Sequence, residues 1–183
     1  MALTYSKMLD LGTELPKFEL PNVMDDILYS TLNLKNKNTV VMIICNHCPY
    51  VIHYHDEIKK IINDYIKNNI RFIAISSNDI NNYPDDSPDK MKKLFEDLDI
   101  SIPYLYDETQ NVAKMFKAEC TPEFYLFNNN NKLVYRGRLD PSSPGNNEEI
   151  TGEDLRMSIE ASLKNEKINQ NQFPSMGCNV KWK

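Results

Sequence analysis

The chain has 183 residues, of which 41% are hydrophobic, and its formal net charge at pH 7 is −5. This length suits one domain with a sizeable core, so we expect residues 1–183 to form a single domain. The acidic balance provides no basic surface for nucleic acid, and no apolar run approaches the length of a membrane span. The first ten residues lack the basic and apolar regions of a secretory signal. We therefore expect a cytoplasmic protein that binds neither nucleic acid nor membrane.

The patterns divide the chain into three parts. Turn-forming residues such as Gly12 and Pro16 predict an irregular N-terminal extension over residues 1–38. Within this extension, Leu28 to Leu34 is expected to add a short strand, as part of a hairpin ahead of the main sheet. Residues 39–164 carry the regular patterns of a core, and residues 165–183 form a C-terminal tail that begins with a polar stretch.

The stretch from Thr39 to Tyr50 is the most informative part of the core. Its first half is apolar and mostly β-branched, which predicts a strand buried on both faces. After Pro49, apolar residues at three- and four-residue spacing predict one face of a helix. These residues are Val51, Tyr54, Ile58, Ile61, Ile62, Tyr65 and Ile66. Because Pro49 suits a first helical turn, Cys45-Asn46-His47-Cys48 is expected at the junction of a strand and a helix N-terminus.

Cys45 and Cys48 form a Cys-x-x-Cys unit, which near a βαβ pattern indicates redox chemistry. Free N–H groups at a helix N-terminus favour negative charge, and the thiolate is the reactive form of cysteine. Two cysteines at this spacing can also close a disulfide. We interpret Cys45 as the exposed, acidic thiol and Cys48 as the more buried one. His47 is expected either to favour the thiolate or to be an exposed residue of the first turn.

The rest of the core alternates strands and helices. Ile70 to Ile75 predicts a second buried strand, which completes a βαβ unit. Ser87 and Pro88 have the residue types of an N-cap and a first helical position. A short extended piece is expected over Ile102–Tyr106, and a short helix over Glu108–Lys117, with Val112, Met115 and Phe116 inward.

The last part of the core predicts a hairpin and a closing helix. Cys120 to Phe127 favours a strand, and Pro122 must lie at its start or edge because proline cannot donate to a sheet. Leu133 to Leu139 predicts the returning strand. Thr151 with Asp154 resembles a capping box ahead of a helix that buries Leu155, Ile159 and Leu163.

In this order the elements resemble a thioredoxin fold, and five segments together resemble the redoxin branch, specifically its peroxiredoxin-like proteins. The segments are Cys45-Asn-His-Cys48-Pro-Tyr-Val, Ser77-Asn-Asp79, Cys120-Thr-Pro-Glu-Phe, Tyr135-Arg-Gly-Arg and Pro174-Ser-Met-Gly-Cys178. The resemblance runs from about Leu11 to Lys183. It implies an α/β thioredoxin-like fold, with a central mixed β-sheet flanked by helices, a redoxin-type N-terminal extension and a C-terminal tail.

The resemblance also implies roles for individual residues. Cys45 matches the attacking cysteine and Cys48 the resolving one. Pro122 matches the cis-proline beside the motif, and Thr121 the residue whose backbone pairs with a bound polypeptide or thiol. The implied activity is thiol–disulfide exchange with a disulfide or dithiol protein, or with a small thiol. This chemistry needs no metal or organic cofactor.

Two departures bear on the alternatives. The peroxidatic motif Pro-x-x-x-Thr/Ser-x-x-Cys fits poorly, since Val41 stands at its proline position, and the arginine of the peroxidases is missing. We therefore expect weak peroxidase activity at most. The predicted strand before the motif also lacks the buried acid of thioredoxins. A thiol peroxidase that reacts through a sulfenic acid is one alternative, and a metal-binding or docking module, including a zinc site, is another.

The tail and the remaining cysteines lead to further expectations. Phe173 and Trp182 are costly to leave in water, so the tail is expected to pack back onto the domain, with Gly177 allowing a close approach. Cys178 is then expected near Cys120, as a second redox pair, a structural clasp or two unrelated buried thiols. Glu123 is expected to be an exposed strand carboxylate, with a proton relay near Pro122 as the alternative.

Overall fold

The computed structural model describes residues 3–34 and 36–183. Within these residues, five strands form a mixed sheet in the order β6-β5-β4-β8-β9. The strands are β4 (Asn38–Ile43), β5 (Ile70–Ser76), β6 (Tyr104–Tyr106), β8 (Glu123–Phe127) and β9 (Leu133–Gly137). β4, β5 and β6 run parallel, while β8 is antiparallel to β4 and to β9. The predicted βαβ unit and the late hairpin are thus confirmed.

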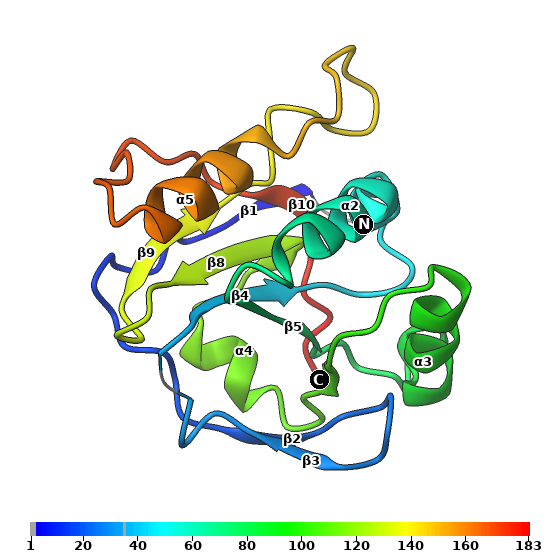
Figure 1. The fold of residues 1–183 in the computed structure, drawn as a ribbon. Helices are drawn as coiled ribbons and strands as arrows, with labels where there is room; N and C mark the ends of the chain where they lie inside the picture. Colours follow the sequence, from blue (N-terminus) through cyan, green and yellow to red (C-terminus); the bar gives the residue numbers. More distant parts are fainter. Residues whose placement is uncertain (1–2, 35) are drawn as a thin grey trace.

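Both faces of this sheet are covered, as the predicted burial of β4 requires (Figure 1). Alternate residues of a strand point to opposite faces, so Val40 and Met42 pack on one side and Val41 and Ile43 on the other. The first side holds α1 (Pro49–Ile52), α2 (His55–Tyr65), α3 (Pro88–Asp97) and α5 (Glu153–Leu163). The second side holds α4 (Asn111–Met115) and the N-terminal hairpin of β2 (Glu19–Pro21) and β3 (Leu28–Ser30).

The tail joins the domain as a strand. β10 (Met176–Asn179) lies between β1 (Leu3–Tyr5) and β7 (Cys120–Thr121), antiparallel to both, and Figure 1 shows β1 and β10 side by side. The predicted docking is therefore confirmed. The expected burial of the two aromatic rings is wrong, since Phe173 is 53% and Trp182 38% exposed. The tail is held by backbone pairing of β10 with β1 and β7, and not by burial of these rings.

Tertiary contacts correct three local predictions. The helix after the motif is split at Tyr54, whose hydroxyl donates to the carbonyl oxygen of Ser142 (2.5 Å). The helix predicted over Glu108–Lys117 begins only at Asn111, after a left-handed Gln110, and leaves Met115 48% exposed.

The third correction concerns the capping box. α5 begins after Gly152, whose φ of 64° is left-handed, so Thr151 is not its N-cap residue. Asp154 instead accepts a hydrogen bond from Arg138 Nε (2.7 Å). Asp140 accepts the backbone N–H groups of Thr151 and Gly152, which sets the chain direction at the helix start.

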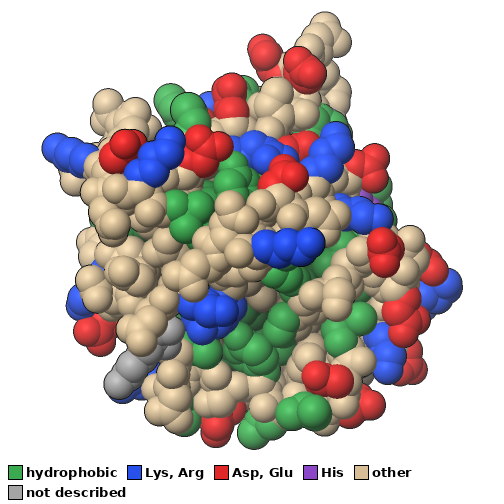
Figure 2. All heavy atoms as spheres, viewed as in Figure 1, with side chains coloured by type: hydrophobic (Ala, Val, Ile, Leu, Met, Phe, Trp, Pro, Cys, Tyr) green, Lys and Arg blue, Asp and Glu red, His purple; other side chains and the backbone are tan. Residues whose placement is uncertain are grey.

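The surface agrees with the modest acidic charge. Figure 2 shows Lys and Arg side chains interspersed with Asp and Glu on the face in view. In the described part of the chain, none of the helices has the length and apolar character that crossing a membrane requires.

Candidate active site

The two motif cysteines lie in the connection from β4 to α1. Cys48 is the N-cap residue of α1 and Pro49 its first residue, so Cys45 stands three residues ahead of the cap. Both are buried, with 1% of Cys45 and 0% of Cys48 exposed. The prediction that Cys45 is exposed is therefore wrong. The helical conformation starts only at Pro49, so both cysteines lie at the junction of strand and helix, as predicted.

Thr121 and Pro122 lie directly against this connection. The Thr121–Pro122 peptide bond is cis, as predicted. Cys45 Sγ is 3.3 Å from Thr121 Oγ1, and Cys48, when protonated, donates to the Thr121 carbonyl oxygen at 3.3 Å. The edge of Thr121 is paired with Cys178 of the chain's own tail. That edge is the one that the resemblance assigns to a bound polypeptide.

The hydrogen bonds distribute charge unequally over the two sulfurs. The pKa of Cys48 falls to about 5, chiefly because the Cys45 thiol donates a hydrogen bond to it, with further donation from Cys178 and Thr121. The pKa of Cys45 rises well above its usual range, because Cys45 holds the shared proton, is buried and lies near the carboxylate of Asp86. The acidic thiol is thus Cys48, which reverses the prediction for Cys45.

Asp86 organises the motif backbone. It closes a 3-10 turn, η1 (Pro84–Asp86), and its side chain is fully buried. Asp86 Oδ1 accepts the backbone N–H groups of Asn46 (2.7 Å) and His47 (3.3 Å), while Oδ2 accepts from the Asn78 amide (2.7 Å). Sequence reasoning missed this residue, because Asp85 and Asp86 together are typical of a solvated turn. Asp86 is thus a buried acid near Cys45, whereas β4 before the motif carries none.

His47 is half-buried and lies outside the helix, so it is not an exposed first-turn residue. Its Nδ1 is 2.7 Å from Asp86 Oδ2, and its ring stacks on Tyr83 with centroids 5.5 Å apart. Cys45 Sγ, a His47 ring nitrogen and an Asp86 carboxylate oxygen all lie within 4.8 Å of one another. These atoms are of types that bind metals, and they number one fewer than the four ligands of a structural zinc site.

Glu123 is 2% exposed, so the expectation of an exposed carboxylate is wrong. It accepts the backbone N–H groups of Glu119 (2.8 Å) and Cys120 (3.0 Å) and the Tyr125 hydroxyl (2.5 Å). Burial raises the pKa of Glu123 above its usual value. The fold therefore places this carboxylate at the start of β8, directly after Pro122 and in contact with Cys120.

The strand register brings Cys178 near Cys120, as predicted, and agrees with the third alternative, two unrelated buried thiols. Cys178 stands opposite Thr121, and Asn179 opposite Cys120. Because successive residues of a strand face opposite sides, the two thiols point to opposite faces of the small sheet. The Cys120 thiol donates a hydrogen bond to Glu123 Oε1 (3.5 Å), whereas the Cys178 thiol makes a hydrogen bond with the Cys48 sulfur.

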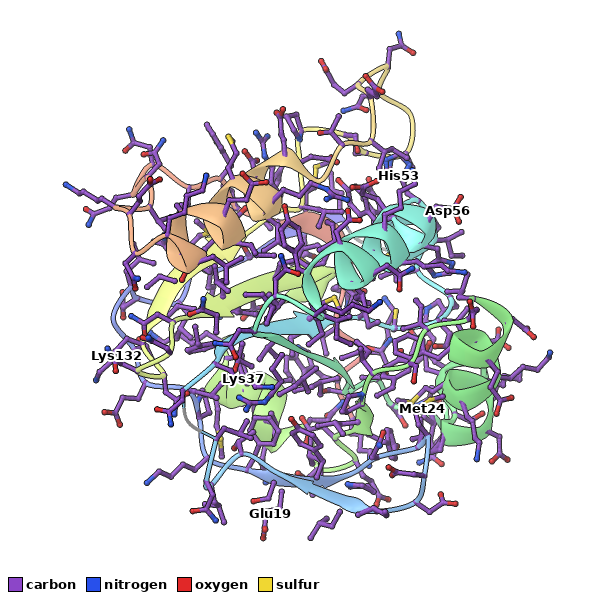
Figure 3. All side chains as sticks on the ribbon, viewed as in Figure 1. Glu19, Met24, Lys37, His53, Asp56 and Lys132 are labelled. Atoms are coloured by element: carbon purple, nitrogen blue, oxygen red, sulfur yellow. The ribbon has the colours of Figure 1, made fainter. Side chains whose placement is uncertain are left out.

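A cavity of 260 Å³ lies beside Pro122. Its lining includes Tyr54, Asp140, Ser142 and Phe173. His53, labelled in Figure 3, directly follows α1. Its Nε2 lies 3.0 Å from Ser142 Oγ. The cavity thus combines aromatic walls with hydroxyl and carboxylate groups.

Comparisons with known proteins agree with this architecture. An uncharacterized conserved protein from Geobacillus kaustophilus is 46% identical, with a TM-score of 0.97 over 100% of this chain and 97% of that one. A hypothetical protein from Sinorhizobium meliloti is 35% identical, with a TM-score of 0.95 over 98% of each chain. A Chlorobium tepidum structure described as a thiol:disulfide interchange protein is 14% identical, with a TM-score of 0.68 over 85% of this chain and 99% of that one. That last likeness shows the fold alone.

No curated protein sequence matches the chain significantly. Residues 10–155 match the family described as Redoxin. The mixed sheet with helices on its faces is the α/β thioredoxin-like fold that the sequence implied. On this evidence, the chain belongs to the Redoxin family.

Proposed function

We propose that the protein is a thiol–disulfide oxidoreductase in which Cys45 and Cys48 alternate between a dithiol and a disulfide. The observation that carries the proposal is the hydrogen-bonded pair itself, in which a proton on Cys45 supports a thiolate on Cys48. A thiolate is the nucleophile of thiol–disulfide exchange. A second thiol in hydrogen-bond contact with it can then resolve the mixed disulfide. The substrate is a disulfide of a protein or of a small molecule.

In this mechanism Cys48 is the attacking cysteine and Cys45 the resolving one, the reverse of what the family resemblance implies. The Cys48 thiolate attacks one sulfur of the substrate disulfide, and the other sulfur leaves as a thiolate that takes up a proton. Cys45 then loses its proton and attacks Cys48 Sγ in the mixed disulfide. The second substrate thiol is released and the Cys45–Cys48 disulfide forms, so the substrate gains the two electrons that the protein loses. A partner dithiol returns the protein to its reduced state.

The cavity beside Pro122 supplies the surface on which a substrate segment would rest. Its aromatic and polar lining, with Tyr54, Asp140 and Phe173, suits a peptide next to a disulfide better than a small inorganic oxidant. Membership of the Redoxin family supports thiol chemistry as the reaction class. The substrate itself would approach from this cavity, because the tail already occupies the edge of Thr121.

Reduction of insulin disulfides with dithiothreitol as the electron donor tests the proposal. We expect the wild-type protein to accelerate precipitation of the insulin B chain, and Cys45→Ser and Cys48→Ser to abolish the acceleration. Cys120→Ser is the matched control, because this buried thiol bonds to Glu123 on the other face of the small sheet, and it should retain activity. Full activity in the Cys48→Ser variant would refute the mechanism.

A thiol peroxidase remains the first rival, and we predict weak activity of this kind. The chain has four arginines, and each one has a hydrogen-bond partner other than the motif cysteines; Arg138 is the one that lines the cavity beside Pro122. Arg71 donates to Thr39, Arg136 to Leu9, Arg138 to Asp154 and Arg156 to Glu57. No arginine guanidinium is thus left unpaired to stabilise peroxide in the transition state. Peroxide consumption as fast as that of dedicated peroxidases would favour the rival.

Metal binding is the second rival, and the grouping of Cys45, His47 and Asp86 is the observation in its favour. A metal there would occupy Cys45 and remove it from exchange. Metal analysis of the reduced protein after incubation with zinc and gel filtration separates the two functions. Two results together would establish the rival. The wild type would bind one zinc per chain, which Asp86→Asn would not bind, and the wild type would fail to reduce insulin.

A further inference from the structure

A third thiol lies against the motif. Cys178, on β10, stands opposite Thr121 in the strand register, and Thr121 contacts both Cys45 and Cys48. The Cys178 side chain and its backbone N–H both hydrogen-bond to the Cys48 sulfur. The contacts therefore connect Cys45 to Cys48 and Cys48 to Cys178, with Cys48 in the middle of the row.

The fold holds Cys178 in this place from both sides. On one side, Gly177 passes so close to Thr121 that an added Cβ would lie 2.0 Å from its carbonyl oxygen. On the other side, the Lys181 N–H donates to Asn78 Oδ1 (2.8 Å), and its carbonyl oxygen accepts from the Asp79 N–H (2.9 Å). Cys178 is consequently 4% exposed, and the position of its sulfur beside Cys48 is a fixed feature of the tail.

We propose that Cys178 is a third redox-active thiol, which exchanges with the Cys45–Cys48 disulfide to give a Cys48–Cys178 disulfide. The inference rests on the proposed function, which supplies the starting disulfide. Cys178 loses its proton and its sulfur attacks Cys48 Sγ. The bond between Cys45 and Cys48 breaks, and Cys45 leaves as a thiolate that takes up the proton. One disulfide replaces another, so the step needs no oxidant or reductant.

The oxidised state makes this step easier than the reduced structure suggests. In the dithiol form, burial and the hydrogen bond to Cys48 raise the pKa of Cys178 to about 12. Once Cys48 is in a disulfide it carries no negative charge, so this second cause disappears. A disulfide needs sulfurs about 2.05 Å apart, so the step requires the Cys48 and Cys178 side chains to move inward from hydrogen-bond contact. The product would link the tail covalently to the motif and free the Cys45 thiol.

Disulfide mapping of the full-length protein tests the inference. Oxidation with diamide, blocking with N-ethylmaleimide and non-reducing tryptic digestion give distinguishable products. Cys45 and Cys48 share the peptide 38–59, Cys120 is in 118–132 and Cys178 is in 168–181. We expect the wild type to yield both an internally bridged 38–59 peptide and a 38–59/168–181 cross-link. Cys45→Ser should yield the cross-link alone, and Cys45→Ser/Cys120→Ser, the matched control, should match it.

Each outcome decides one of the two proposals. If Cys45→Ser leaves Cys48 and Cys178 blocked by N-ethylmaleimide, and the wild type shows only the internal bridge, the third thiol is refuted while the proposed function stands. If the wild type lacks the internal bridge but Cys45→Ser forms the cross-link, the proposed function fails and the contact is redox-active. Should Cys45→Ser misfold by circular dichroism, the wild-type cross-link and its loss in Cys178→Ser decide the question.

Discussion

The charge on each cysteine is decided by the donors and acceptors around its sulfur. Donors from Cys45, Cys178 and Thr121 converge on Cys48, whereas the carboxylate of Asp86 lies near Cys45. A negative charge is therefore stabilised on Cys48 and opposed on Cys45. Position in the sequence alone would give the opposite order, because the first cysteine of a Cys-x-x-Cys unit is nearer to solvent when the helix begins at it.

We predict that a thiolate appears at about pH 5 when the reduced protein is titrated. The pKa of Cys48 is about 5, so its thiol is protonated below that pH and charged above it. The absorbance at 240 nm should rise through this midpoint, and the rate of insulin reduction should rise with it. Cys48→Ser should remove the transition and Cys120→Ser should preserve it. A first transition near pH 8.5, the ordinary value for cysteine, would contradict the assignment.

At the same scale, Asp86→Asn is predicted to loosen the motif backbone. The amide keeps one acceptor oxygen but turns a donor toward N–H groups of Asn46 and His47 or toward Asn78. Leaving such buried donors unsatisfied costs about 1–3 kcal/mol of unfolding free energy. Urea denaturation of the reduced protein measures this loss. Asp85→Asn is the matched control, because that neighbouring side chain is exposed and pairs with Lys90, and it should leave the midpoint unchanged. Equal urea midpoints for both variants would show that the Asp86 side chain does not stabilise the motif backbone.

At the scale of elements, β10 is the piece that completes the site. It pairs with β1 on one side and β7 on the other, and so places the C-terminal tail beside Thr121, which contacts the motif. A strand placed between two short edges depends on close backbone contact. Gly177 provides that contact with Thr121, which explains why a glycine stands before Cys178.

Gly177→Ala is predicted to detach β10 from β7. The new methyl group would lie 2.0 Å from the Thr121 carbonyl oxygen, so the strands must separate. Overpacking of this kind costs about 1–3 kcal/mol. Hydrogen exchange should become faster in residues 176–180, and the Cys48–Cys178 cross-link should diminish. Met176→Ala, on the same strand and half-buried, is the control and should keep slow exchange at Cys178. Unchanged exchange in the Gly177 variant would disprove the role of close contact.

At the scale of the whole molecule, the environment of Cys48 sets the redox poise. A stabilised thiolate favours the dithiol form, which makes the disulfide a stronger oxidant. With a pKa of about 5 for Cys48, we predict a reduction potential between roughly −270 and −120 mV, the interval spanned by thioredoxin-type proteins whose nucleophiles have pKa values of about 7 and 3.5. Equilibration with glutathione buffers measures this potential. Cys178→Ala, which removes the side-chain hydrogen bond to the thiolate, should lower it. A wild-type value below that interval would contradict the stabilised thiolate.

The sequence by itself determined the elements and their order. The β-branched run before Cys45 gave a buried strand, Pro122 marked the start of the hairpin strand, and the apolar tail residues indicated docking. These features follow from local patterns, since periodicity and proline restrict the chain within a few residues. They were sufficient for the order of elements in the α/β fold and for the position of the Cys-x-x-Cys unit at a strand–helix junction.

Only the tertiary structure decided what surrounds the two sulfurs. Asp86 and Cys178 reach the motif from about 40 and 130 residues further along the chain, and no local pattern separates Asp86 from Asp85. Burial of Glu123 likewise depends on the strands that cover it. A thiol pKa is set by the donors, charges and solvent within a few ångströms. The position of the charge on Cys48 is therefore a property of the folded molecule, because folding brings those groups together.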